Sequence, residues 1–282
     1  MQTIGVVGAG TMGRGIAQVA ATAGYQVQWW DAVSGQVAAG KSRIYDLLEK
    51  RVAQGKLDAS SLTNLHSRLE PVAELSQLAN CELVVEAIPE QLELKRQLFQ
   101  TLETIVTPNC ILATNTSSLS IAAISSPLQH PERLIGTHFF NPVPLMVLLE
   151  IVVHPKTATE VLAATTAFGR QLGKEVITVN DFPGFASSRL GVCLGMEAIR
   201  MVEQGVASPE DIDKAMVLGY RHPVGPLRLT DMVGLDVRMN IGSYLAVALQ
   251  NPAFEPPELM KRMVQDGLLG QKSGKGFYTW DS

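Results

Sequence analysis

The sequence is poor in cysteine and has no long hydrophobic run, and both features restrict where the protein can work. Its 282 residues include three cysteines, Cys81, Cys110 and Cys193, which form no C-x-x-C pair. Scattered cysteines in apolar surroundings indicate reduced core thiols and a cytoplasmic protein without a metal site. No apolar run approaches the roughly 20 residues that a membrane helix needs, so we expect no membrane association.

Charge is also scarce, and it is not clustered. Charged residues make up 18% of the chain, and the net charge is −4 without a basic block. Nucleic acid is therefore not an expected partner. Met1 leads directly into the first predicted strand, so we expect no signal or transit peptide. The hydrophobic fraction of 46% is typical of a globular protein, and the length suffices for one large or two ordinary domains.

A glycine-rich turn lies close to the start of the chain. Residues 4–7 predict a short buried strand, and three glycines follow in a G-x-G-x-x-G turn before a helix of residues 15–23. The first glycine permits the tight turn, the second lets the backbone approach a pyrophosphate, and the third lets the helix pack on the strand. The helix start presents N–H groups and a positive dipole end to phosphates. The expected dinucleotide contacts here are Gly8, Gly10, Thr11, Met12 and Gly13.

An acidic residue follows at the distance that a dinucleotide site requires. Residues 25–30 predict a second buried strand that ends at Asp31, about 20 residues after the glycines. A carboxylate there accepts hydrogen bonds from the ribose hydroxyls and repels a 2′-phosphate, and residues 32–34 offer no arginine to receive one. The pattern therefore predicts NAD rather than NADP. A structural turn followed by a capping aspartate is the alternative interpretation.

Strand and helix patterns alternate along the first two-thirds of the chain. This alternation predicts an α/β fold with a Rossmann-type, doubly wound and mostly parallel sheet in residues 1–183. After a break at residues 181–185 no convincing strand appears, so residues 184–282 predict a smaller all-helical domain. The further expected strands are residues 83–87, 110–113, 133–140, 147–153 and 175–179. The further expected helices are residues 33–54, 59–65, 91–105, 157–172, 187–203, 209–218, 226–233 and 235–249, with a short helix from residue 119.

The most informative polar pair is His138 and Glu150. Glu150 lies within an apolar strand pattern, where burial of a carboxylate is costly unless it finds a partner. The Asn-Pro-Val-Pro turn at residues 141–144 folds this strand back toward the one that carries His138, which makes the histidine the expected partner. A carboxylate on one ring nitrogen fixes the tautomer and raises the basicity of the imidazole, as a general base needs. The alternative is a core histidine beside an edge glutamate.

Two other polar groups each have two interpretations. Asn115 and Ser117 follow a buried strand, where they either face the ligand crevice of the sheet or belong to a hydroxyl run, residues 114–118, that caps the next helix. Lys50 and Lys56 lie near the end of the second predicted helix. They either form a solvated face that complements the helix dipole or hold substrate phosphates.

Taken together, the motifs resemble those of the L-3-hydroxyacyl-CoA dehydrogenases. The resemblance rests on GAGTMGRGIA at residues 8–17, ATNTSS at residues 113–118 and HFFNPVP at residues 138–144. It extends to DFPGF, HPVGP and KSGKGFY further along, covers the whole chain, and is closest to the single-function, prokaryotic-type 3-hydroxybutyryl-CoA dehydrogenases. It implies an NAD-dependent oxidoreductase of fatty acid metabolism that interconverts short L-3-hydroxyacyl-CoA and 3-oxoacyl-CoA. It also implies a homodimer formed through the helical, substrate-binding domain.

The resemblance implies roles for individual residues as well. His138 is the implied base for the hydroxyl proton, and Glu150 is the residue that orients it. Ser117 is implied to bond the reacting oxygen, and Asn141 to position nicotinamide and the histidine. The implied NAD contacts beyond the glycine turn and Asp31 are Ala87, Glu90, Lys95, Asn115, Ser117, Asn141 and Lys272. The implied substrate contacts are Ser117, Ser188, Lys50 and Lys56.

Two positions depart from the pattern of the family. Ser188 stands where most relatives carry an asparagine on the substrate side, and Gln54 stands where relatives often carry a lysine near the CoA phosphates. The departure at Ser188 bears on the preferred substrate more than on the reaction. Two other functions stay open: a dehydrogenase of small 3-hydroxy acids or sugar acids, similar to the gulonate dehydrogenases, and a non-catalytic NAD-binding protein of the lambda-crystallin kind. The intact Ser117, His138 and Glu150 disfavour the second.

Overall fold

The chain folds into two compact units. The computed structural model describes residues 1–280, and contacts between residues divide the chain into unit 1, Met1–Asp181, and unit 2, which begins at Phe182. The last two residues of the expected second domain, residues 281–282, lie outside the described residues. No described helix is both long and apolar enough to cross a membrane.

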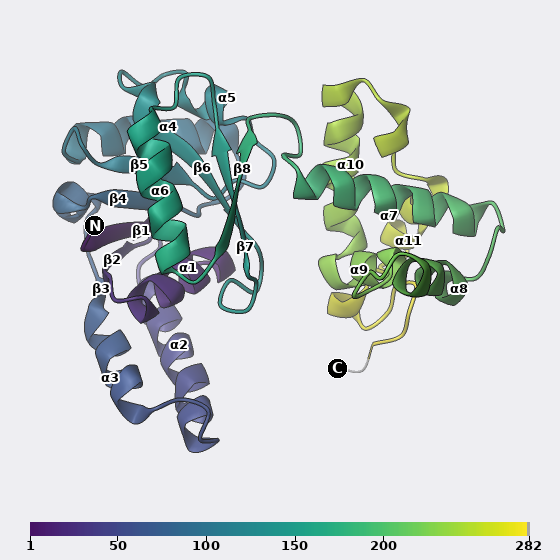
Figure 1. Ribbon diagram of the computed structural model, residues 1–282, viewed down its shortest axis with the longest axis horizontal. Helices are drawn as coiled ribbons and strands as arrows, with labels where there is room; N and C mark the ends of the chain where they lie inside the picture. The colour runs from purple at the N-terminus through teal and green to yellow at the C-terminus, as the bar shows by residue number, and fades with distance from the viewer. Residues whose placement is uncertain (281–282) are drawn as a thin grey trace. The chain divides into compact units, whose positions relative to one another are not determined.

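Unit 1 is built on one eight-stranded sheet (Figure 1). Its strand order is β3-β2-β1-β4-β5-β6-β7-β8, and all neighbours are parallel except the antiparallel pair β6 and β7. The predicted α/β class and mostly parallel sheet are confirmed. The strands are β1 (Thr3–Val7), β2 (Gln26–Trp30), β3 (Leu69–Pro71), β4 (Leu83–Glu86), β5 (Ile111–Thr114), β6 (Leu134–Phe139), β7 (Leu148–Val153) and β8 (Glu175–Asn180).

The strand order changes direction at β1: β2 and β3 lie on one side of β1, and β4 and the later strands lie on the other. Strand β2 pairs on one side of β1 and β4 on the other, so the carboxyl ends of β1 and β4 flank the place where doubly wound sheets bind ligands. The edge strand β3 was not predicted. It has only three residues and ends at Pro71, which lacks an N–H for a further ladder bond.

Helices cover both faces of this sheet. Figure 1 shows α6 in front of the sheet and α4 behind it, and a hairpin of α2 and α3 that extends away from the sheet. Ile16 of α1 and Phe168 of α6 belong to the same hydrophobic cluster as Trp29 of β2. The helices of unit 1 are α1 (Thr11–Thr22), α2 (Gln36–Ala53), α3 (Ala59–Arg68), α4 (Leu92–Ile105), α5 (Ile121–Ser125) and α6 (Thr159–Gln171), with short 3₁₀ helices η1 (Leu75–Asn80) and η2 (Pro131–Arg133).

The described residues 182–280 of unit 2 form helices and turns without a strand, as predicted. The expected helix of residues 209–218 is only partly correct, because the α-helix ends at Lys214 and continues as a wider π-helical turn. Helix α11 was not predicted. The elements are α7 (Ser187–Glu203), α8 (Pro209–Lys214), η3 (Ala215–Gly219), α9 (Pro226–Val233), α10 (Leu235–Leu249), η4 (Pro252–Phe254), α11 (Glu258–Gln265) and η5 (Gln271–Ser273).

Two buried carboxylates attach the end of the chain to the core of unit 2. Asp231 accepts hydrogen bonds from the Tyr278 N–H at 2.9 Å and from the Trp280 indole at 2.9 Å. Asp213 accepts one from the Tyr278 hydroxyl at 2.8 Å and one from the Leu227 N–H at 2.8 Å. Burial, followed by the bond to Asp213, raises the pKa of Tyr278. This network therefore orders the last described residues without a regular element.

Candidate active site

The glycine turn after β1 is tightly packed at Gly8 and Gly13 and open at Gly10. Gly8 has φ of +107°, and a Cβ there would lie 2.5 Å from the carbonyl oxygen of Ala87. A Cβ on Gly13 would lie 2.0 Å from the carbonyl oxygen of Gly8, whereas a Cβ on Gly10 would meet no described atom within 4 Å. The space beside Gly10 is thus left open where a pyrophosphate is expected.

The start of α1 fits the same ligand. Gly10 is its N-cap residue and supplies no side chain, and no side-chain hydrogen bond caps this end. The first N–H groups of a helix lack intrahelical partners, and with the helix dipole they favour an anion. Thr11 is exposed and Met12 half-buried at this end. Together with the open space beside Gly10, the uncapped helix end matches the needs of a dinucleotide pyrophosphate.

Asp31 lies beside the glycine turn, directly after β2. Its carboxylate accepts hydrogen bonds from the Ala9 N–H at 2.6 Å and from the Val33 N–H at 2.8 Å. The indole of Trp29 donates to the carbonyl oxygen of Gly8 at 2.9 Å, which gives the turn a second link to β2. The end of β2 and the turn are therefore held together, and the half-buried carboxylate is placed next to the open space.

His138 and Glu150 face each other across the antiparallel pair β6 and β7. The His138 Nδ1 lies 2.7 Å from the Glu150 Oε2, so the expected contact is confirmed. Glu150 is 0% exposed and His138 is 7% exposed. Because an ionised carboxylate only accepts hydrogen bonds, Nδ1 of the neutral ring carries the proton and Nε2 carries the lone pair. The arrangement is suited to a histidine that accepts a proton at Nε2.

The turn between β6 and β7 is fixed by contacts from two sides. It contains Asn141, which forms a cis peptide bond with Pro142. The amine of Lys174 donates to the carbonyl oxygens of Val143 at 2.6 Å and of Met146 at 2.7 Å, and burial lowers the pKa of this lysine.

On its other side the same turn packs against α1. A Cβ on Gly15 would lie 2.8 Å from the Cβ of Val143, so the helix approaches the turn closely only because residue 15 is glycine. Neither Gly15 nor Lys174 was singled out from the sequence, where the two residues lie far from the turn that they contact.

Glu90 holds the turn that contains Ser117. Its Oε1 accepts hydrogen bonds from the Thr116 hydroxyl at 2.6 Å, the Ser117 N–H at 2.9 Å and the Ser118 N–H at 3.2 Å. Burial acts to raise the pKa of Glu90, but the charge of Lys95 and these bonds outweigh it, and the pKa is lowered. Glu90 is therefore an ionised acceptor around which the Ser117 turn is built.

Asn115 joins the ends of two strands beside the histidine. Its Oδ1 accepts a hydrogen bond from the Phe139 N–H at 3.0 Å, which links the end of β5 to the end of β6. The alternative interpretation, in which the run at residues 114–118 caps the next helix, is wrong. The N-cap of α5 is Ser120, whose hydroxyl accepts from the Ala123 N–H at 3.1 Å. The run instead forms a separate turn at the carboxyl end of the sheet.

Lys95 is buried in an ion pair that the sequence interpretation missed. It is 1% exposed, and its Nζ lies 2.5 Å from the Oε1 of Glu86 and 3.4 Å from the Oε2 of Glu90. Glu86 ends an apolar strand pattern, the same signal that identified Glu150, and a lysine follows nine residues later. Burial raises the pKa of Glu86, opposed by the charge of Lys95. Ala87, half-buried, follows directly and packs its carbonyl against Gly8.

The two remaining candidates from unit 2 lie on separate elements of it. Ser188 is half-buried in the first turn of α7, which follows Gly184 and Phe185 in left-handed conformations with φ of +78° and +49°. Lys272 is exposed, and its amine lies 2.6 Å from the carboxylate of Asp236. That Ser188 contacts the substrate stays a prediction.

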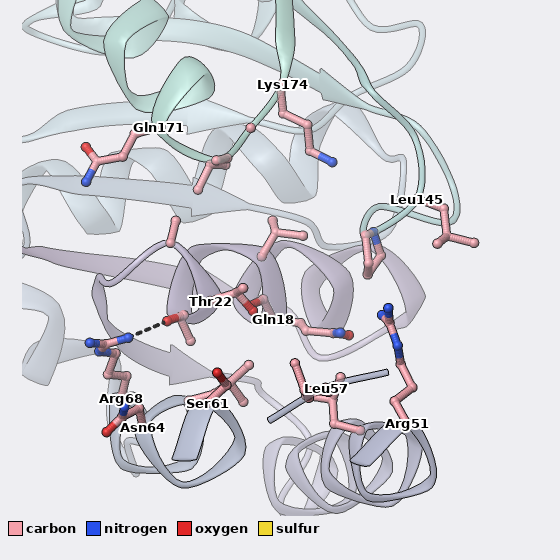
Figure 2. Close-up of a pocket in the computed structure, with 18 of the residues that line it drawn as sticks. Gln18, Thr22, Arg51, Leu57, Ser61, Asn64, Arg68, Leu145, Gln171 and Lys174 are labelled. Carbon is pink, nitrogen blue, oxygen red and sulfur yellow. Dashed lines mark hydrogen bonds between the residues drawn. The ribbon is translucent and has the colours of Figure 1, made fainter. Parts of the chain in front are cut away.

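Lys50 and Lys56 are exposed at the end of α2 and in the connection that follows it. A cavity of about 540 Å³ in unit 1 lies beside α1, and Figure 2 shows the side chains of Gln18 and Arg51 directed into it. None of the expected site residues lines this cavity. Its lining includes Gln18, Arg51, Leu57, Arg68, Leu145 and Lys174.

Comparisons with known proteins cover the whole described chain. Residues 3–182 match the family model of the 3-hydroxyacyl-CoA dehydrogenase NAD-binding domain, and residues 184–280 match that of its C-terminal domain. A 3-hydroxybutyryl-CoA dehydrogenase of Mycobacterium tuberculosis is 42% identical over 282 residues, which is 99% of each chain. A 3-hydroxyadipyl-CoA dehydrogenase of Escherichia coli is 41% identical over 281 residues, which is 99% of this chain and 59% of that longer protein. The crystal structure of the (S)-3-hydroxybutyryl-CoA dehydrogenase from Ralstonia eutropha has a TM-score of 0.95 at 38% identity and covers 100% of both chains.

Proposed function

This chain belongs to the 3-hydroxyacyl-CoA dehydrogenase family, and from this premise we propose that it oxidises the 3-hydroxyl of a short L-3-hydroxyacyl-CoA, 3-hydroxybutyryl-CoA in particular, and catalyses the reverse reduction. The observation that carries the proposal is the buried pair of His138 and Glu150 at 2.7 Å. It lies at the carboxyl end of β6, the same edge of the parallel sheet as the glycine turn after β1.

NAD, the cofactor of the family, supplies the hydride acceptor when it is bound. The N–H groups at the start of α1 receive its pyrophosphate, and Asp31 accepts hydrogen bonds from the ribose hydroxyls. The Nε2 of His138 takes the proton of the substrate hydroxyl as the hydride leaves C3. The imidazolium that forms is stabilised by Glu150. Ser117 donates a hydrogen bond to the reacting oxygen, and Asn141 keeps the histidine and nicotinamide in register.

We also propose roles for the two domains and for the remaining residues that the family resemblance implies. Residues 1–183 bind NAD, and residues 184–282 bind substrate and form a homodimer. Lys50 and Lys56 receive CoA phosphates, and Ser188 contacts the acyl group.

The cytoplasm is the proposed location, since Cys81, Cys110 and Cys193 are free thiols. Dimerisation is supported by large apolar side chains left exposed in unit 2, among them Leu190, Leu218, Tyr220 and Val247. The further proposed NAD contacts are Ala87, Glu90, Asn115 and Lys272. Lys95, which was expected among them, is 1% exposed, so we propose that it acts on the cofactor site only through Glu90.

The test follows NADH absorbance with three substrates. We expect turnover of L-3-hydroxybutyryl-CoA and none of free 3-hydroxybutyrate; the reverse preference would support a dehydrogenase of small hydroxy acids instead. No turnover at all, with NAD still bound, would support a non-catalytic protein of the crystallin kind. L-3-hydroxyadipyl-CoA is the third substrate, because relatives of nearly equal identity are named for different acyl groups.

Asp31→Ala is expected to relax the preference for NAD over NADP. The substitution removes the charge that repels a 2′-phosphate, so the ratio of kcat/KM for the two cofactors should fall by about 10-fold or more. The ratio is the informative quantity, because Asp31 also bonds the Ala9 N–H and its loss loosens the turn for both cofactors. Asp46→Ala, an exposed aspartate of α2, is the control. A wild-type enzyme that uses both cofactors equally would contradict the assignment.

Ser188→Ala is expected to lower kcat by less than about 10-fold, and Ser188→Asn to stay active with an altered KM for acyl-CoA. A well-placed donor to developing charge contributes about 10²–10³ in kcat, but the shorter reach of serine makes its contribution smaller. The measurement is kcat and KM for both variants with acetoacetyl-CoA and a longer homologue. If Ser188→Ala equals the wild type on both substrates, Ser188 has no part in the site.

A further inference from the structure

A fully buried ion pair lies next to Glu90, the residue that holds the Ser117 turn. Glu86, the last residue of β4, is 0% exposed, and Lys95 of α4 is 1% exposed, with 2.5 Å between the Oε1 and Nζ. Removing two charges from water is costly, and apolar side chains of similar volume often stabilise a fold as well or better. Stability therefore gives no sufficient reason for this pair.

Glu86 has a second function in the fold as an anchor, because both of its oxygens accept further bonds. Its Oε2 accepts from the Thr114 hydroxyl at 2.6 Å, and its Oε1 accepts from the Ile88 N–H at 2.8 Å. Thr114 ends β5, so the carboxylate is fixed between the ends of two strands. The ammonium of Lys95 is thereby held at a defined place at the carboxyl edge of the sheet.

The anchored ammonium also reaches Glu90. The Nζ of Lys95 lies 3.4 Å from the Oε2 of Glu90, a longer contact than the one with Glu86. The other oxygen of Glu90 accepts the bonds from Thr116, Ser117 and Ser118 at 2.6, 2.9 and 3.2 Å. A continuous set of contacts therefore runs from Glu86 through Lys95 and Glu90 to the Ser117 turn.

We propose that Glu86 is a positioning residue for the proposed dehydrogenase reaction: it retains Lys95 in the buried pair, so that Glu90 keeps its bonds with the Ser117 turn. One ammonium stands between two carboxylates. If the charge of Glu86 is removed, the ammonium pairs with Glu90 alone. Lys95 is buried, although the side chain of Glu90 is 36% exposed, so solvent screens their attraction only in part. Glu90 then turns toward Lys95, and the hydroxyl of Ser117 moves away from the reacting oxygen. This inference rests on the proposed function of Ser117.

Glu86→Gln is the first variant, and we expect kcat to fall by about 10-fold. Loss of a donor to developing charge costs about 10²–10³ in kcat, and a displaced donor costs less than a deleted one. KM for acyl-CoA should change by less than about threefold, since the CoA end is bound elsewhere. Glu82→Gln is the matched control, because it makes the same change at an exposed residue just before β4. An unchanged kcat in Glu86→Gln would overturn the proposal.

The double variant Glu86→Gln/Lys95→Met separates positioning from stability. It removes the competing ammonium as well, so Glu90 is left with the Ser117 turn, and kcat should recover at least about threefold over the single variant. A purely structural pair predicts no such recovery, and its absence would also overturn the proposal. If Glu86→Gln does not fold, the double variant decides instead. It leaves no ammonium to compete for Glu90, so a kcat more than about 10-fold below that of the wild type would contradict the inference.

Ser117→Ala shows which of the two proposals has failed. If Ser117→Ala keeps the wild-type kcat, the proposed role of Ser117 is wrong, and the positioning inference falls with it. If Ser117→Ala loses activity while Glu86→Gln does not, only the positioning inference is wrong. The same NADH assay and thermal melts of each variant provide all the measurements.

Discussion

Glu150→Gln is expected to lower kcat by about 10²–10⁴-fold while the fold stays intact, since this is the usual contribution of general acid–base catalysis. Glutamine has nearly the same shape as glutamate, and its carbonyl oxygen can still accept the hydrogen bond from the Nδ1 of His138. The neutral amide cannot stabilise the imidazolium that forms when His138 takes the hydroxyl proton. Both side chains are buried, so little solvent screens the loss of this charge.

The measurement is the pH profile of kcat and kcat/KM in the direction of oxidation, together with a thermal melt. Glu160→Gln is the matched control, because it makes the same chemical change at an exposed position in the first turn of α6. We expect the control to keep the kcat of the wild type. A Glu150→Gln enzyme with an undiminished kcat and an unmoved pH profile would remove Glu150 from the mechanism.

The contact between His138 and Glu150 could be predicted because three local signals agree. A carboxylate in an apolar strand needs a partner, the proline-containing turn reverses the chain, and a tight reversal makes neighbouring strands antiparallel. The register then pairs the two residues directly. The glycine turn was predictable for a similar reason, since each glycine is required by the backbone geometry of a few consecutive residues.

Contacts between distant elements were not predictable in the same way. Lys174 lies 31 residues from Val143, to which it donates, and Gly15 meets that same residue from α1. The pair of Glu86 and Lys95 had a visible signal, but the pattern does not say that Glu90 lies next to it. Such contacts depend on how helices pack on a sheet, which hydrophobic periodicity alone does not specify. Short elements such as β3 are also not predictable, because three residues are too few to show the alternation typical of a strand.

Gly13→Ala is expected to destabilise the fold strongly, whereas Gly10→Ala is expected to leave its stability almost unchanged. A Cβ on Gly13 would lie 2.0 Å from the carbonyl oxygen of Gly8, and both partners belong to the backbone, so neither can rotate away. Gly13→Ala should therefore lower the free energy of unfolding by about 3 kcal/mol or more, or prevent folding. A Cβ on Gly10 meets no described atom within 4 Å, and φ of −65° suits any residue. Gly10→Ala should therefore change the free energy of unfolding by no more than about 0.5 kcal/mol.

The same pair tests whether the open space beside Gly10 belongs to the cofactor. If the pyrophosphate approaches the backbone there, the added methyl group occupies its place, and Gly10→Ala should weaken NAD binding by about 10-fold or more. Denaturant unfolding and calorimetric titration with NAD measure the two effects separately. Gly191→Ala is the control, because it adds a methyl group to α7 where no described atom lies within 4 Å. A stable Gly10→Ala protein that binds NAD as tightly as the wild type would show that the cofactor does not use this space.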